Sequence, residues 1–427
     1  MQATRLSTAG RRILLAGLVP AFPLLLLSPP AKAGPAAGVA DQDLRDRVTL
    51  RNGRTLKGRE TQELDDRICL LVGTRERWIR RKLVREIQSV ARSMVDLLLR
   101  YRKESPRRPA ELWPFVDFCR KHRLSHEEKL FCRRILLADS KHDQANMRLG
   151  HLKRGDHWLV PVKSQWVPLE QACRIHRDWG KAWEIRSEHF AVRSCSSLKL
   201  AMDTLFELEY MYLYFYILYQ KPLELRELVE PVRVFLFKDR KQYPSAGTHV
   251  GAYFSGAENI LYTYIGNNKR PFALFHEATH GLIHNVAVHT TRTRGKFPSW
   301  LDEAWAVYME NLVVPTGRGI VNLRQGRTGG NMMRVVATAR KPYKVHRILN
   351  FTSSDYGASS KQTLKYAQGF VLFHYLMHGA DGAYRSRFTD YIKQALGGKG
   401  QASTFRRIFR KDLQRIERGY IAHARSG

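Results

Sequence analysis

Two histidines four residues apart, in the sequence HEATH, are the residues of this chain whose types and spacing most clearly predict chemistry. In a helix, His276 and His280 would project from the same side, about one turn apart, and could bind one metal ion. Zinc suits two imidazoles and a carboxylate, a ligand set that leaves a fourth position open for water. Glu277 could accept the proton of that water and pass it to a leaving amine. The spacing therefore predicts a zinc site with Glu277 as the general base.

A third ligand is expected on the next helix. The segment FPSWLDEAWAVYMENL predicts a helix from Ser299 to Val313, and it places Glu303 23 positions after His280. A helix antiparallel to the first would bring this carboxylate to the ion. The alternative interpretation of HExxH is two surface histidines beside a solvated acid.

These motifs resemble the gluzincin pattern of zinc metallopeptidases in peptidase clan MA. The likeness is closest to uncharacterised, secreted, peptidase-MA-like bacterial proteins. It also includes SEHFAVRS, VRVFLFKDRKQYP and KYAQGFVLFHYL, and it covers roughly residues 182–380. The resemblance implies one Zn²⁺ ion bound by His276, His280 and Glu303, with Glu277 as the base. It also implies that Tyr366 stabilises the oxyanion, although Tyr366 could instead be a core residue and His374 or Tyr308 could take that role.

Two positions depart from that pattern. Ala304 stands where these families usually have glycine, and Val307 stands where thermolysin-like enzymes have an aspartate that orients a ligand histidine. Ligand histidines nearly always need such a partner. We therefore expect Asp302 or Glu310 to provide it.

The order of the elements predicts an α+β fold. Residues 34–90 alternate like short strands and predict a small β-rich module similar to SH3 or Sm barrels. Residues 91–181 predict a helical module with a β-hairpin connector. Residues 182–427 run from strands to helices, which is typical of α+β domains. From the resemblance, we expect this last part to be a zincin-like peptidase domain, with a small mixed sheet, an active-site helix and a helical C-terminal subdomain.

The first 33 residues predict a secretory signal peptide. Arg5, Arg11 and Arg12 precede an apolar run from Ile13 to Leu27, and small residues at the cleavage-recognition positions follow it. A membrane anchor is the alternative, but 15 residues fall short of the ~20 needed to span a bilayer. We expect a secreted, periplasmic or cell-envelope protein with no transmembrane span in the mature chain.

The chain is strongly basic, with 72 lysines and arginines against 39 acids and a net charge of +33. Its 44% hydrophobic content excludes a disordered tail protein. Positive charge attracts polyanions whatever the fold. Because export makes nucleic acid an unsuitable target, an anionic envelope polymer or lipid surface is the expected partner, besides a peptide or protein substrate. The alternative explanation of the charge is a generally basic proteome. The alternative function is a non-catalytic, degenerate zincin that binds the envelope.

Two further expectations concern the substrate and the cysteines. An extended peptide would pair with an edge strand, and residues 259–265, just before the zinc helix, are the candidate edge. Five cysteines occur without a CxxC spacing. Cys119 and Cys132 could form a disulfide across a predicted helix pair, and buried free thiols are the alternative.

Overall fold

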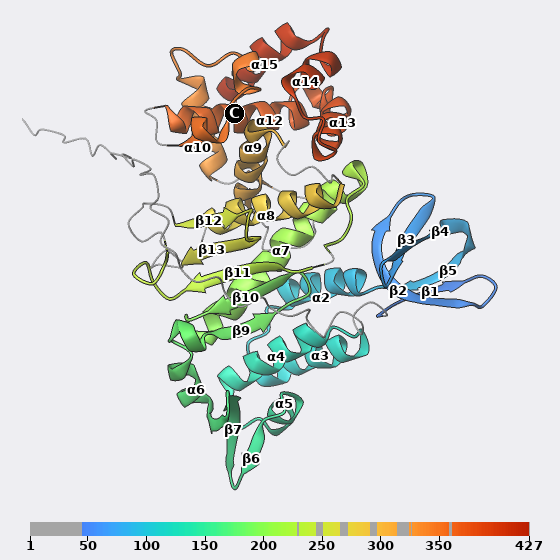
Figure 1. The fold of residues 1–427 in the computed structure, drawn as a ribbon, viewed down its shortest axis with the longest axis vertical. Helices are drawn as coiled ribbons and strands as arrows, with labels where there is room; N and C mark the ends of the chain where they lie inside the picture. Colours follow the sequence, from blue (N-terminus) through green and yellow to red (C-terminus); the bar gives the residue numbers. More distant parts are fainter. Residues whose placement is uncertain are drawn as a thin grey trace, which may run out of the picture.

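A computed structural model describes residues 45–228, 230–244, 251–264, 272–290, 297–313, 324–325, 327–357 and 361–426. The predicted signal peptide, residues 1–33, lies outside the described residues. The described chain combines sheets and helices, which confirms the α+β class. Figure 1 shows the elements arranged along one long axis, with the first sheet to one side and the C-terminal helices at one end. None of the described helices is both long enough and apolar enough to cross a membrane.

The N-terminal module is one antiparallel sheet with the strand order β4-β3-β2-β1-β5. Its strands are β1 (Asp46–Leu50), β2 (Thr55–Glu63), β3 (Arg67–Val72), β4 (Arg75–Arg80) and β5 (Val84–Gln88), and a short helical turn, η1 (Arg81–Leu83), precedes β5. Gly53 turns the chain between β1 and β2 at a φ of +85°, which favours glycine. Val48, Ile68 and Leu70 are buried, because alternate residues of each strand face one side.

A helical module and a small three-stranded sheet follow. The helices are α2 (Val90–Glu104), α3 (Pro109–Lys121), α4 (Ser125–Ala138), α5 (Asp143–Arg148) and α6 (Leu169–Ile175), and the strands are β6 (Leu152–Arg154), β7 (His157–Val162) and β8 (Gln165–Pro168). The expected hairpin is present as β7 and β8. The helices α3 and α4 pack against each other, and Phe115 and Phe131 stack between them.

Of the two possibilities for Cys119 and Cys132, buried free thiols are confirmed and the disulfide is wrong. All five cysteines are free thiols, and these two are completely buried. Burial raises the pKa of Cys132 to about 12, so this thiol stays protonated and unreactive. Both residues therefore serve as small apolar side chains in the core.

The central sheet has the strand order β12-β13-β11-β10-β9. Its strands are β9 (Trp183–Arg186), β10 (Phe190–Ser194), β11 (Val232–Phe237), β12 (Ala252–Ser255) and β13 (Ile260–Tyr264), and a short turn, η2 (Trp179–Lys181), precedes β9. The strands β10, β11 and β13 are parallel, whereas both outer strands are antiparallel to their neighbours. The helix α7 (Leu198–Leu223) connects β10 to β11 and is buried along most of its length.

The prediction that residues 259–265 form the sheet edge is wrong. The strand β13 lies between β11 and β12, and the four-residue strand β12 takes the outer place. The reason is a tight turn at residues 256–259, which folds β12 back along β13. The outer strand at this side of the sheet is therefore β12.

The remaining elements are mainly helical. They are α8 (Phe272–Thr290), α9 (Ser299–Glu310), β14 (Leu312–Val313), β15 (Arg324–Gln325), α10 (Arg327–Ala337), α11 (Val345–Ile348), η3 (Ser353–Tyr356), α12 (Gln362–His378), η4 (Ala380–Gly382), α13 (Arg385–Leu396), α14 (Ala402–Ile408) and α15 (Leu413–Ser426). The helix α8 packs against β12 and β13 on one side and against α9 on the other. The helix α9 in turn contacts α12, so it lies between two helices (Figure 1).

Candidate metal centre

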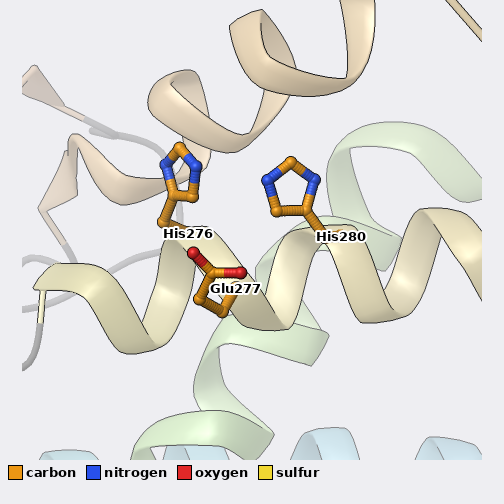
Figure 2. Close-up of side chains that lie close together, drawn as sticks. All are labelled: His276, Glu277 and His280. Carbon is orange, nitrogen blue, oxygen red and sulfur yellow. The ribbon is translucent and has the colours of Figure 1, made fainter. Parts of the chain in front are cut away.

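The helices α8 and α9 bring the predicted metal ligands together. Figure 2 shows the imidazoles of His276 and His280 projecting from the same side of α8. Glu303 faces them from α9, with its Oε2 atom 3.3 Å from Nε2 of His276 and 3.6 Å from Nε2 of His280. The two ring centres are 4.9 Å apart. Each predicted ligand thus points one donor atom at a shared point.

These separations fit a tetrahedral zinc ion. Zinc binds imidazole nitrogen and carboxylate oxygen at about 2.0–2.2 Å, so two ligand atoms at a tetrahedral angle lie about 3.4 Å apart. His276, Glu277 and His280 also form a possible metal-binding group, with ligand atoms within 4.8 Å of one another. The predicted ligand set contains Glu303, whereas this group contains Glu277 instead. Glu303 is the better third ligand because its Oε2 atom lies near the Nε2 atoms of both histidines, whereas Glu277 accepts a hydrogen bond from the backbone of Phe254.

The second ring nitrogen of each histidine meets its own carboxylate. The Nδ1 atom of His276 lies 3.2 Å from Oε2 of Glu310, and Nδ1 of His280 lies 2.9 Å from Oδ1 of Asp302. A carboxylate accepts the Nδ1 proton, which fixes the ring and directs the Nε2 lone pair at a metal. Asp302 and Glu310 were the two residues expected for this role, and each contacts a different histidine.

The electrostatics of the site favour a divalent cation. Burial by itself would lower the pKa of His276, but the hydrogen bonds with Glu303 and Glu310 raise it to about 9. Burial opposes protonation of His280 too, yet Asp302 and Glu303 raise its pKa well above the usual value. The imidazoles overcome the effect of burial on Glu303 and lower its pKa to about 2. Without a metal, both imidazoles therefore carry an added proton near neutral pH. These two protons bring a charge of +2, which equals the charge of one divalent ion.

Glu277 is held between the ligands and the sheet edge. Phe254 on β12 donates its backbone N–H to Oε2 of Glu277 over 2.8 Å. Burial raises the pKa of Glu277, although the two imidazoles and this hydrogen bond oppose the rise. A carboxylate whose pKa is shifted toward neutrality suits a general base. The described position therefore fits the role predicted from the motif.

Tyr366 approaches the same site from α12. Its ring centre lies 6.2 Å from that of His276. Burial, followed by the charges of Glu303 and Glu277, raises the pKa of Tyr366, so its hydroxyl remains a hydrogen-bond donor. This placement fits an oxyanion donor, which must keep its proton at working pH.

The two alternative donors are engaged elsewhere. The hydroxyl of Tyr308 lies 2.9 Å from Nε2 of His378, and Nδ1 of His374 lies 2.8 Å from Nε2 of His423. These contacts direct both side chains toward α12 and α15 rather than toward the predicted ligands. The hydroxyl of Tyr366 also has a hydrogen bond, with Gln362, but its ring contacts that of His276. This contact makes Tyr366 the better of the three sequence candidates.

Small residues let α9 approach its neighbours closely. A Cβ atom at Gly369 of α12 would lie 3.5 Å from Cβ of Ala304, which is an ordinary contact. Alanine at position 304 is therefore accommodated by α12. On another side of α9, Trp305 is buried and stacks on Phe215 of α7 at 5.3 Å between ring centres. This packing fixes the helix that carries Glu303.

Tyr356 on η3 is a further residue beside the site that no sequence pattern indicated. This side chain is buried, its ring centre lies 4.9 Å from that of Tyr366, and its hydroxyl has no hydrogen-bond partner. Burial, followed by the charge of Glu303, raises its pKa. No motif surrounds Tyr356, so only the folded arrangement of η3 and α12 could reveal it.

Comparison with known proteins adds one finding. A family described as a protein of unknown function (DUF1570) matches residues 272–395. The matched segment begins with α8 and ends within α13, so it contains the predicted ligands, Glu277 and Tyr366, whereas Phe254 of β12 lies before it. No curated protein matches the chain.

Proposed function

We propose that this chain is a secreted, zinc-dependent peptidase of the gluzincin type with a zincin-like fold. His276, His280 and Glu303 would bind one zinc ion, and Glu277 would act as the general base. The observation that carries the proposal is the convergence of two Nε2 atoms and one carboxylate oxygen at 3.3 and 3.6 Å. A carboxylate on each Nδ1 atom supports it further.

The described side chains can perform the proton transfers that amide hydrolysis needs. Zinc, when bound, supplies Lewis acidity and lowers the pKa of a water molecule beside it. Glu277 would accept the proton of the attacking water as its oxygen adds to the carbonyl carbon. Glu277 would then deliver that proton to the leaving amine as the C–N bond breaks. Tyr366 would donate a hydrogen bond to the carbonyl oxygen while it carries negative charge.

The edge strand β12 is the proposed place for the substrate backbone. Phe254 pairs with Leu261 in the sheet register, yet its N–H points to Glu277 and away from β13. Backbone groups alternate in direction along an antiparallel strand, so those of Ala252 also face outward. A peptide that adds to this edge as an extended strand would pass beside Glu277.

The alternative is a non-catalytic, degenerate zincin that binds the envelope. It rests on the strongly basic charge and on Val307, which stands where an orienting aspartate is expected. Asp302 and Glu310 supply carboxylates to both histidines, so the missing aspartate gives no reason to doubt metal binding. Export to the envelope, and attraction to an anionic polymer or lipid surface there, remain part of the proposal and rest on the sequence and its charge of +33.

The test replaces the base and leaves the ligands in place. The Glu277→Gln variant should bind zinc as the wild type does, and it should cleave a peptide library about 10²- to 10⁴-fold more slowly. The same exchange at the exposed Glu86, in the N-terminal sheet, is the matched control and should change neither property. Unchanged cleavage by Glu277→Gln would contradict the proposed mechanism.

A further inference from the structure

The carboxylate of Glu303 takes its hydrogen bonds from the two ligand histidines. Its Oε2 atom lies 3.3 Å from Nε2 of His276 and 3.6 Å from Nε2 of His280. Among the described residues, no third group donates a hydrogen bond to this carboxylate. A ring nitrogen that binds a metal uses its lone pair and has no proton to donate. Because carboxylates that bind a metal are usually hydrogen-bonded as well, Glu303 then needs another donor.

The hydroxyl of Tyr356 on η3 has the complementary deficit, because it is a donor without an acceptor. Its side chain is only 4% exposed, and the hydroxyl has no hydrogen-bond partner. Native proteins keep few buried polar groups without a partner, and each such group calls for an explanation. An acceptor that becomes available when a metal binds would explain this one.

The fold holds that hydroxyl at the contact between α9 and α12. It lies 3.6 Å from the point that a Cβ atom on Gly369 of α12 would occupy, and Cβ of Ala304 on α9 lies 3.5 Å from the same point. Ala304 directly follows Glu303. Among the charges that act on the pKa of Tyr356, the charge of Glu303 has the largest effect. The donor without an acceptor therefore lies beside the part of α9 that carries the ligand carboxylate.

Hydrogen bonds to η3 fix the backbone of Tyr356 against α12. Lys365 donates from Nζ to the backbone oxygen and to Oδ1 of Asp355, over 2.8 and 3.0 Å. Gln362 donates from Nε2 to the backbone oxygen of Tyr356 over 2.8 Å. The ring also meets Phe351 edge-on, at 5.9 Å between ring centres. A side chain held in this way can move its hydroxyl only slightly, so its acceptor must lie close by.

We propose that Tyr356 is a positioning residue of the metal centre, and that its hydroxyl donates a hydrogen bond to the carboxylate of Glu303 when His276 and His280 bind zinc. The inference rests on the proposed zinc site and deepens it. The Oε2 atom of Glu303 would face the ion, which leaves Oε1 for the hydroxyl. Burial, followed by the charge of Glu303, raises the pKa of Tyr356, so the hydroxyl keeps the proton that it donates. The hydroxyl of the neighbouring Tyr366 is already hydrogen-bonded with Gln362.

The Tyr356→Phe variant of the full-length mature protein tests the proposal, because zinc affinity and stability should not change together. The dissociation constant for zinc should rise about 10- to 100-fold, since Glu303 loses its donor. The midpoint of urea unfolding of the metal-free variant should stay the same or rise, since the lost hydroxyl had no partner. Competition with a chelator measures the first quantity, and urea unfolding in excess chelator measures the second. A purely structural tyrosine would give the reverse, a lower midpoint with unchanged zinc affinity.

Tyr219→Phe is the matched control. Tyr219 is also buried, but its ring contacts Trp305 on another side of α9, so its loss should leave zinc affinity unchanged. An equal loss of zinc affinity in this control would overturn the proposal.

The remaining outcomes separate this inference from the zinc site on which it rests. Zinc binding by the wild type with unchanged affinity in Tyr356→Phe overturns the role of Tyr356 alone. Absence of zinc binding by the wild type overturns the zinc site and this role with it. A metal-free Tyr356→Phe protein that unfolds at lower urea concentration, or does not fold, also overturns the role, because the hydroxyl would then already have a partner.

Discussion

Two regions of this molecule combine buried histidines with carboxylates, and they use them differently. In the candidate metal centre, Nε2 of His276 and Nε2 of His280 converge on Glu303, while each Nδ1 meets another carboxylate. Just before β10, the single histidine His189 lies between two carboxylates, with Glu209 at 2.7 Å from Nδ1 and Glu227 at 3.8 Å from Nε2. The first arrangement leaves a shared point for a cation, and the second leaves none.

The difference shows what a carboxylate contributes beside a histidine. At His189 the carboxylates neutralise a single buried imidazole, whose ring also stacks on Tyr212 at 3.6 Å between centres. In the metal centre they orient two imidazoles so that both point the same way. Pairing of histidine with acid is therefore not by itself a sign of metal binding, and the convergence of two rings is the informative feature.

Removing one histidine from each region should give the largest contrast. His280→Ala should abolish stoichiometric zinc binding and peptide cleavage, because two ligands remain of three. His189→Ala should retain zinc but lose about 3–5 kcal/mol of unfolding free energy, because it leaves Glu209 buried without its ionic partner. Metal analysis measures the zinc content of both variants, and urea unfolding measures their free energies of unfolding. Full zinc occupancy in His280→Ala, or loss of zinc in folded His189→Ala, would refute the contrast.

The tyrosines around the metal centre allow a sharper comparison. Tyr366→Phe should lower kcat about 10²- to 10³-fold with little change in KM, because an oxyanion donor acts mainly in the transition state. Tyr308→Phe removes a hydroxyl that contacts His378 and should leave kcat within a fewfold of the wild type. Steady-state kinetics on one peptide substrate measures kcat and KM of both variants. If the two variants were equally impaired, Tyr366 would have no special role.

Removing an orienting carboxylate should have a smaller effect. Asp302→Asn and Glu310→Gln should each weaken zinc binding about 10- to 100-fold, because the ring loses the partner that fixes its tautomer. Competition with a chelator of known affinity measures the change, and Glu86→Gln serves again as the control. Wild-type affinity in both variants would mean that these contacts do not orient the ligands.

The sequence predicted those parts of the site that depend on local spacing. His276, Glu277 and His280 share one turn of a helix, so their arrangement follows from helical periodicity alone. The prediction of Glu303 as the third ligand required only that the next helix pack against the first. The sequence could not assign Asp302 and Glu310 to separate histidines, because that depends on how α9 is rotated against α8.

The errors arose where distant segments decide the outcome. The strand β12 is only four residues long, so it gave too weak a pattern to displace residues 259–265 as the expected edge. Tyr356 became visible only when η3 was placed beside α12. Strand order and helix docking are tertiary properties, and local patterns do not contain them.

Zinc titration of metal-free protein at pH 7, in buffers of different ionisation enthalpy, tests the central claim most directly. The pKa of His276 is raised to about 9 in the metal-free site, so zinc must displace protons there, and its apparent affinity should fall as the pH is lowered. We predict one zinc ion bound and about two protons released per chain, with both lost in Glu303→Gln. Absence of zinc binding, or unchanged binding by Glu303→Gln, would contradict the account.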